Sequence, residues 1–431
     1  MKKVSNIFLV SVSFLIIAIH VLSYISKLNN FEDELIVLTS HIYFLSELEF
    51  KAPFLVDNEI FTPALTTGFN SSVGGAIGWF LYKDFYFSRL FNFIWLALQI
   101  FLFNFYLYKN KIIKIEFFYF SILGLFCIPL WYNSLYGLGE ILSSLLFFNS
   151  LLLFKKNPNF SMLLMSISIF YGKFIIFLSF SIFVLINMKK QYMRSILYFF
   201  IPPAVWLLII YLKTGISGLL NYLNRYIEFL FFHGVTKNNT SLTFFQEVKN
   251  NIALSEISDW SYTTLARVVI IPIMFSLFLV FKYLMKKNSL VELTISIIIM
   301  INYLYFFLFS YQKYLRYSQI FLVITIYYIL FLLSSEKNLH SYEKLILIFF
   351  LSFYFSSEVL MISLIMVTFL SFRKKSIFNF LFIFLLLNIL NLQYESSNYL
   401  VNNLNISECK ENISSVACIK NYLPYDYEIL D

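Results

Sequence analysis

The sequence predicts an all-α, polytopic membrane protein, a helical bundle of about thirteen segments. The chain has 431 residues, of which 60% are hydrophobic, with 54 Phe and 31 Tyr. Apolar runs recur from end to end, and many are long enough to cross a hydrocarbon core of roughly 30 Å. The lysines cluster in short segments between these runs, which is typical of cytoplasmic loops. The net charge of +8 therefore indicates no nucleic-acid partner, since no basic stripe with interleaved aromatic residues is present.

The first apolar run, 7–24, follows the basic start "MKK" and sets the direction of the path. No small-residue cleavage site follows it, so we expect an uncleaved first span with the N-terminus inside. Residues 27–62 then lie outside and carry seven acids against two lysines. Every basic cluster is required to be cytoplasmic. These clusters are Lys2/Lys3, Lys109/Lys111/Lys114, Lys155/Lys156, Lys189/Lys190/Arg194, Lys282/Lys286/Lys287, Lys337/Lys344 and Arg373/Lys374/Lys375.

To satisfy this requirement, some apolar stretches must turn back. Residues 62–82 are rich in Gly, Ser and Thr, so we expect a surface or re-entrant helix at the outer interface rather than a crossing. Residues 160–187 are too long for one simple span, and we expect two short helices that turn at Tyr171, Gly172 and Lys173. Residues 342–372 are expected to fold back at 356–358 in the same way.

The path divides the chain into four parts. An N-terminal membrane module covers 1–212, with its first exterior loop at 27–87. An exterior loop follows at 213–262, then further membrane helices at 263–392 and a short exterior tail at 393–431. Cys127 lies in an apolar run and is expected to pack in the core. Cys409 and Cys418 share the exterior tail, where a disulfide that closes a short loop can persist.

The polar residues on the outer face are candidates for chemistry. They are Glu32/Asp33/Glu34, Asp57/Glu59, Glu140, Lys173, His233 and Lys313/Arg316. A carboxylate at the membrane boundary can deprotonate an acceptor hydroxyl while Lys or Arg holds a phosphate leaving group. Each residue also has a structural interpretation. The first acids suit a solvated loop, Glu140 suits a helix N-terminus, and Lys173 can extend its ammonium group toward the interface. No His, Cys and Asp spacing indicates a metal site, so we expect no metal cofactor.

Several of these stretches resemble class C (GT-C) glycosyltransferases, the membrane enzymes that use polyprenyl-phosphate sugars and include protein O-mannosyltransferases and the lipid A aminoarabinose transferase. "FEDELIVLTSHIYFL" is similar to their first exterior loop, with Asp33 and Glu34 in the place of the family's Asp-Glu pair. "DNEIFTPALTTGFNSSVGGAIGWFLYKDFYFSRLFNF" is similar to the next block, where the matching positions are Glu59, Pro63, Gly68 and Arg89. "WYNSLYGLGE" places Glu140 as the second exterior acid, "YGKF" supplies Lys173, and "YLRY" supplies Arg316.

The resemblance covers mainly residues 1–190 and implies a GT-C fold and an inverting sugar transfer. The donor would be a polyprenyl-phosphate sugar and the acceptor a cell-envelope glycan, lipid or protein, on the exterior face of the cytoplasmic (inner) membrane. Asp33 would be the general base, Glu34, Glu59 and Glu140 would orient acceptor or sugar, and Lys173 and Arg316 would hold the donor phosphate. The second acid is Glu and no Asp-x-Asp is present, which argues against metal dependence of the oligosaccharyltransferase kind.

Two alternatives stay open on the sequence. A flippase or transporter of lipid-linked glycans would favour internal repeats and charges along a central pathway, and neither is visible. An O-antigen-type polymerase would favour a large exterior loop rich in Arg and His. Residues 213–262 contain Arg225 and His233 but are nearly balanced in charge.

Overall fold

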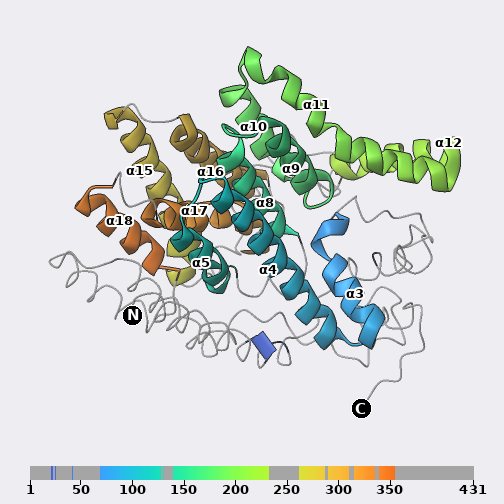
Figure 1. Cartoon of the computed structure of the whole chain (residues 1–431), viewed down its shortest axis with the longest axis horizontal. Helices are drawn as coiled ribbons and strands as arrows, with labels where there is room; N and C mark the ends of the chain where they lie inside the picture. Colours follow the sequence, from blue (N-terminus) through green and yellow to red (C-terminus); the bar gives the residue numbers. More distant parts are fainter. Residues whose placement is uncertain are drawn as a thin grey trace.

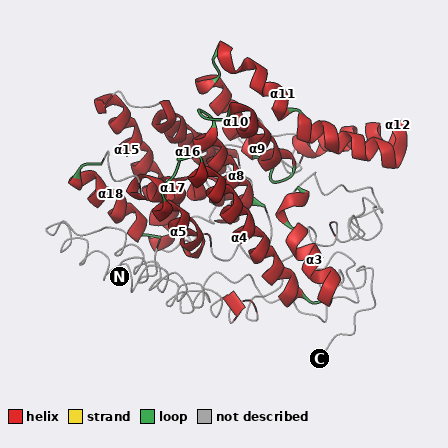
Figure 2. Cartoon of the chain, in the orientation of Figure 1, coloured by secondary structure: helices red, strands yellow, loops and turns green. Residues whose placement is uncertain are grey.

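The computed structural model describes residues 68–127, 130, 139–232, 262–286, 290–309, 315–334 and 339–354, together with the single residues 21, 22, 25 and 41. All secondary structure in these ranges is helical, so the all-α prediction is confirmed there (Figures 1 and 2). The elements are η1 Phe69–Ser71, α3 Val73–Tyr82, α4 Phe85–Lys109, α5 Ile115–Leu123, η2 Gly124–Phe126, α8 Glu140–Leu153, α9 Pro158–Phe170, α10 Ile176–Asn187, η3 Lys190–Ser195, α11 Ile196–Phe199, α12 Ile201–Phe232, α14 Tyr262–Leu265, the π-helical turn η5 Ala266–Ile270, α15 Ile271–Lys286, α16 Leu290–Phe309, α17 Leu315–Ser334 and α18 Ser341–Ser352.

The long apolar helices give the chain the character of a membrane protein. Among the described residues, four helical stretches have the length and composition to cross a membrane: Tyr86–Lys109, Tyr192–Asn224, Ala266–Met285 and Leu290–Leu308. Large apolar side chains cover their outward faces, such as Leu102 on α4 and Phe281 on α15. Such faces suit lipid, because hydrocarbon chains are as apolar as the side chains themselves. The complete path of about thirteen segments includes residues outside the described ranges and stays a prediction.

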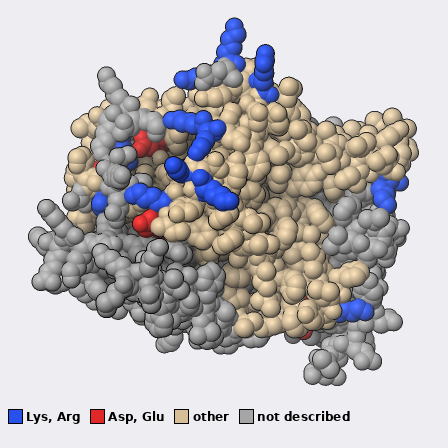
Figure 3. Space-filling view, in the orientation of Figure 1, with Lys and Arg blue, Asp and Glu red and all other residues tan. Residues whose placement is uncertain are grey.

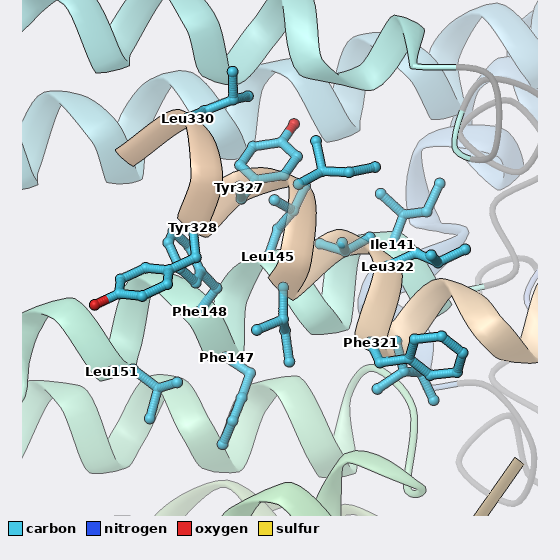
Figure 4. Close-up of a cluster of buried hydrophobic side chains, with 14 of the residues drawn as sticks. Ile141, Leu145, Phe147, Phe148, Leu151, Phe321, Leu322, Tyr327, Tyr328 and Leu330 are labelled. Atoms are coloured by element: carbon cyan, nitrogen blue, oxygen red, sulfur yellow. The ribbon is translucent and has the colours of Figure 1, made fainter. Parts of the chain in front are cut away.

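Helices α8 and α17 form the centre of the bundle. Nearly every described residue of both is buried, which places these helices among the other helices of the bundle rather than against lipid. The Phe148 ring of α8 lies 6.3 Å from both the Tyr327 and the Tyr328 rings of α17. Figure 4 shows these side chains filling the space between the two helices. Cys127 is also buried, as the sequence predicted.

Helices α3 and α4 form a hairpin whose close contact depends on glycine. A Cβ atom on Gly74 or Gly78 would lie 2.5 Å from a backbone oxygen of α4. The two helices can therefore pack this closely only because both positions lack a side chain. Asp84 ends the turn and accepts a hydrogen bond from Tyr86 N at 2.8 Å, which caps α4. With ten residues, α3 is about 15 Å long. This is about half of a core of roughly 30 Å; the predicted stretch 62–82 also includes residues outside the described ranges, and its surface or re-entrant placement stays a prediction.

The predicted break at Tyr171, Gly172 and Lys173 is confirmed. Helix α9 ends at Phe170, and α10 begins at Ile176. The chain then returns to the start of α9, because Ser195 Oγ donates to Asn159 Oδ1 at 2.8 Å. Phe154, beyond the end of α8, contacts the rings of both Phe183 and Tyr192 at 4.8 Å.

Three of the basic clusters consequently share one end of the bundle, here called the basic end. They are Lys109/Lys111/Lys114, Lys155/Lys156 and Lys189/Lys190/Arg194. The Lys156 ammonium donates to the Asn110 carbonyl, which joins the first two clusters. Figure 3 shows most of the visible Lys and Arg side chains in the upper half of this face, while residues other than Lys, Arg, Asp and Glu cover most of its remaining described part.

Helix α12 differs from the prediction that 213–262 is a loop, because its described part, 213–232, is helical. Gly215 has φ 69° and ψ −170°, a backbone conformation that interrupts the helix and suits glycine. Trp206 Nε1 donates to Tyr222 OH at 3.2 Å across this break. The two residues would stand about 24 Å apart along a straight helix, so the apolar stretch folds back on itself as a hairpin. In Figure 1 it projects away from the rest of the bundle.

Candidate functional site

Glu140 is the first residue of α8 and is almost fully buried. Its relative exposure is 1%. Gly139 precedes it with φ 94°, which lets the chain enter the helix sharply without steric conflict. The backbone N–H groups of a first helical turn favour a negative charge. The helix-terminus interpretation of Glu140 therefore holds, and it places a carboxylate inside an apolar bundle.

Lys173 supplies the opposite charge. Its Nζ atom lies 3.0 Å from Glu140 Oε1, and its side chain is 15% exposed against 1% for the glutamate. Among the described residues, neither Glu140 oxygen has a partner in hydrogen-bonding geometry, so the contact at Oε1 is an ion pair at close range. Buried charges of this kind are stable only when paired. The lysine is the partner that reaches toward the surface.

The turn that carries Lys173 is held from two sides. Within the turn, Lys173 N donates to Ser168 O at 2.9 Å. Toward α12, Tyr171 OH donates to Pro202 O at 3.1 Å, and the Tyr171 ring lies 5.8 Å from the Trp206 ring. The α12 hairpin is therefore attached directly to this turn.

The segment that precedes α3 contacts the same turn through backbone hydrogen bonds. Gly68 N donates to Gly172 O at 2.6 Å, and Asn70 N donates to Tyr171 O at 2.8 Å. We call this contact between 68–70 and 171–172 the seam. The Asn70 side chain exchanges two hydrogen bonds with Gln99 of α4, at 3.0 and 3.2 Å. Trp95 Nε1 also donates to Asn70 O at 2.8 Å, so the seam joins α4 to the lysine turn.

His41 lies against the same segment and is fully buried. Its Nδ1 atom is hydrogen-bonded to Ser72 Oγ, and its ring meets the Phe69 ring edge-on at 5.4 Å. Burial lowers the pKa of His41 from 6.5 to about 3, so the imidazole is neutral near pH 7. These contacts tie His41 itself to the start of α3.

His41, Asn70 and Gln99 were not among the predicted site residues. A signal for Gln99 was present, because Asn92 and Gln99 are spaced by seven residues and so share one face of α4. Asn92 Oδ1 accepts a hydrogen bond from Gly75 N at 2.6 Å, and Gln99 holds Asn70. For His41, the distant partner Ser72 left no local pattern to recognise.

Of the six predicted site residues, the structure brings Glu140 and Lys173 together. Asp33, Glu34 and Glu59 lie outside the described residues. Arg316 is the second residue of α17, and its side chain is outside the described part. His233, Lys313, Cys409 and Cys418 are likewise outside it. Within the described ranges, no group of three or more His, Cys, Asp and Glu side chains is arranged to hold a metal ion.

The ion pair lies at the end of α8 opposite to the basic end. Helix α8 begins at Glu140 and ends just before Lys155 and Lys156. Its fourteen residues separate the two ends by about 21 Å. No family model, no curated protein and no solved structure matches the chain. The chemistry of the site therefore rests on Glu140, Lys173 and the residues that hold them.

Proposed function

We propose that the protein is a membrane glycosyltransferase that moves a sugar from a polyprenyl-phosphate donor to an envelope acceptor. The observation that carries this proposal is the Glu140–Lys173 ion pair at the end of the bundle opposite to the basic end. If the basic end is cytoplasmic, as charge distribution in membrane proteins favours, the pair faces the exterior. A donor with its lipid tail in the bilayer would present its phosphate at that level.

Lys173 suits a phosphate leaving group. Its ammonium group is positively charged, partly exposed and held by a carboxylate that is itself sealed from solvent. A preorganised cation stabilises the charge that develops on a departing phosphate, and it does so most strongly where water is excluded. Glu140 was predicted to bind substrate directly, but at 1% exposure its role in the proposal is to hold Lys173.

The remaining chemistry is assigned to the first exterior loop. Asp33 would accept the proton of the acceptor hydroxyl, and the acceptor oxygen would attack the anomeric carbon of the donor. The bond from that carbon to the phosphate oxygen breaks, and polyprenyl phosphate leaves with the electron pair. A single displacement of this kind inverts the anomeric configuration. Glu34 and Glu59 would orient the acceptor, and Arg316 would assist at the phosphate.

The proposal is tested with purified protein in lipid nanodiscs and a panel of polyprenyl-phosphate hexoses and pentoses, radiolabelled in the sugar. We expect release of polyprenyl phosphate with at least one member of the panel. Lys173→Met should abolish release, whereas Lys83→Met, which removes an exposed lysine at the α3–α4 turn, should not.

The same protein in sealed vesicles tests the transporter alternative. The break between α9 and α10 is the observation that favours it, because interrupted helices line the substrate sites of many transporters. Movement of the labelled lipid between leaflets without any release of polyprenyl phosphate would support transport and exclude the transferase.

A further inference from the structure

The seam is a close backbone contact beside the Glu140–Lys173 pair. A Cβ atom added to Gly68 would overlap the Tyr171 backbone and lie 2.5 Å from Gly172 N. A Cβ atom added to Gly172 would overlap Ser143 Oγ and Ser168 O. Since backbone atoms cannot move aside as the end of a side chain can, a larger residue at Gly68 must separate the two segments of the seam, and a larger residue at Gly172 must push the lysine turn away from α8 and the end of α9.

Gly172 belongs to the seam and directly precedes the lysine of the ion pair. One neighbour in the chain is Lys173, whose ammonium group meets Glu140. Beneath Gly172 stands Ser143, one turn after Glu140 on the same face of α8. Ser143 is fully buried, and its Oγ has no hydrogen-bond partner among the described residues. The position of the lysine backbone over α8 is therefore set by close packing at Gly172 rather than by a hydrogen bond from Ser143.

Gly68 lies on the other side of the seam and directly follows the segment 27–67 that contains the predicted acids. Asn70 fixes this side to α4 through Gln99 and Trp95. A shift of 68–70 away from 171–172 would consequently change the position of the lysine turn relative to α4.

We propose that Gly68 and Gly172 are positioning residues for Lys173, and that the seam keeps the lysine ammonium in register with Glu140. The role of this register in transfer rests on the proposed function. The position of the Lys173 ammonium group relative to Glu140 follows from the described contacts, and it can be tested without a transfer assay.

The test measures how fast Lys173 reacts with an amine-directed reagent at pH 7.5, read by mass spectrometry of the modified peptide. In Gly68→Ala the rate should rise about tenfold, the ratio that corresponds to about 1.4 kcal/mol of lost contact. Glu140→Gln serves as the reference for a lysine without its carboxylate. Gly124→Ala is the matched control, because its new Cβ would stand 3.0 Å from the end of the flexible Leu330 side chain.

Lys282 reports on the fold in the same experiment. It is buried, and its Nζ lies 3.2 Å from Glu292 Oε1 between α15 and α16. With Lys282 still protected, an unchanged Lys173 rate in Gly68→Ala overturns the proposal. If Lys282 also becomes reactive, the variant has unfolded, and Asn70→Ala decides instead. That variant loses the amide pair with Gln99 but adds no atom to the seam, so a faster Lys173 supports the proposal and an unchanged one overturns it.

Transfer assays separate this inference from the proposed function. Where the parent protein transfers sugar, Gly68→Ala should raise the KM for the polyprenyl-phosphate sugar and leave the KM for the acceptor unchanged. A general loss of folded protein would change neither KM, and equal changes in both would contradict a role through Lys173. If the parent releases no polyprenyl phosphate with any donor of the panel, the proposed function fails, while the lysine reactivity still decides whether the seam positions Lys173.

Discussion

Glu140 and Lys173 join the first turn of α8 to the turn between α9 and α10 through an ion pair of 3.0 Å. The two partners are not equivalent, since the carboxylate is sealed and the ammonium group is partly exposed. Removing one member of a buried pair leaves an unpaired charge, which is more destabilising than removing both. The two single variants should therefore differ in stability, and the double variant measures how strongly the two charges interact.

The first prediction concerns stability. Glu140→Gln and Lys173→Met should each lower the thermal unfolding midpoint in detergent, and Lys173→Met should lower it more because it leaves the sealed carboxylate alone. The double variant should be less destabilised than the sum of the two, by a coupling of about 1–3 kcal/mol. Thermal unfolding followed by circular dichroism measures all three. Additive effects would mean that the two charges do not interact in the folded protein.

The second prediction concerns orientation in the membrane. Lys83 lies at the α3–α4 turn, whereas Asn110 ends α4 at the basic end. In a background with Cys409 and Cys418 replaced by Ser, a cysteine at position 83 should react with an impermeant thiol reagent from outside. A cysteine at position 110 should react only from inside. Cys127 needs no replacement because it is buried. The reverse pattern would place the ion pair on the cytoplasmic side and remove the basis of the proposed function.

The turn at 171–173 could be predicted from the sequence because two independent demands agree there. The apolar stretch is too long for one simple span, and Lys189 and Lys190 have to return to the side of Lys155 and Lys156. The structure has the break at this place and returns the chain through the Ser195–Asn159 hydrogen bond. Charge and length, which the sequence displays directly, were sufficient.

The path of α12 could not be predicted in the same way. Lys213 and Gly215 are typical of the end of an apolar run, and the polar residues after Leu220 favour a loop. The return of the second arm along the first depends instead on contacts between the two arms, such as the one between Trp206 and Tyr222. The pairing of Glu140 with Lys173 was hidden for the same reason. Each residue was a candidate alone, and only the packing of α8 against α9 sets the distance between them.

The third prediction tests the α12 hairpin. Val205 and Asn224 are exposed and lie on opposite arms. Spin labels at these positions should show a distance well below the roughly 28 Å that nineteen residues of straight helix would span. Gly215→Ala, which is strained at φ 69°, should shift the distribution toward longer distances. A single population near the straight-helix distance in the parent protein would contradict the hairpin.

The fourth prediction is a pH dependence caused by His41. The unfolded chain has a histidine pKa near 6.5, whereas burial lowers the folded value to about 3. Between these values the unfolded state binds one more proton, so stability is fully present above about pH 6.5 and decreases as the pH falls. The loss is about 1.4 kcal/mol per pH unit for one such group.

Unfolding midpoints at pH 7.0 and 5.5, above the range in which most carboxyl groups titrate, measure this effect. The parent protein should lose stability across the interval. His41→Gln should start from a lower stability, because its contacts with Ser72 and Phe69 change, but it should lose less between the two pH values. An equal loss in parent and variant would assign the pH dependence to other groups.

The last prediction concerns Asp33, which lies outside the described residues and is argued from the sequence. Adjacent acids on a helix that begins near Asp33 project about 100° apart, so Glu32, Asp33 and Glu34 cannot share one role. The resemblance to class C glycosyltransferases selects the first acid of the Asp-Glu pair as the base. A positioned general base contributes about 10²–10⁴-fold to the rate. Asp33→Asn should therefore reduce transfer by that factor while donor binding, measured as retention of labelled lipid, is preserved.

The neighbouring acids are the matched controls for Asp33. Glu32→Gln should be mild, as for a solvated loop residue, and Glu34→Gln intermediate if it orients the acceptor. Lys173→Met differs from all three, because it should weaken donor binding as well as transfer. If Asp33→Asn retains the parent rate in an assay where Lys173→Met is inactive, the base is another residue and the phosphate site stands without it. If every one of these variants is active, the transferase is excluded, and transport of the lipid-linked glycan becomes the better explanation of a buried ion pair beside a broken helix.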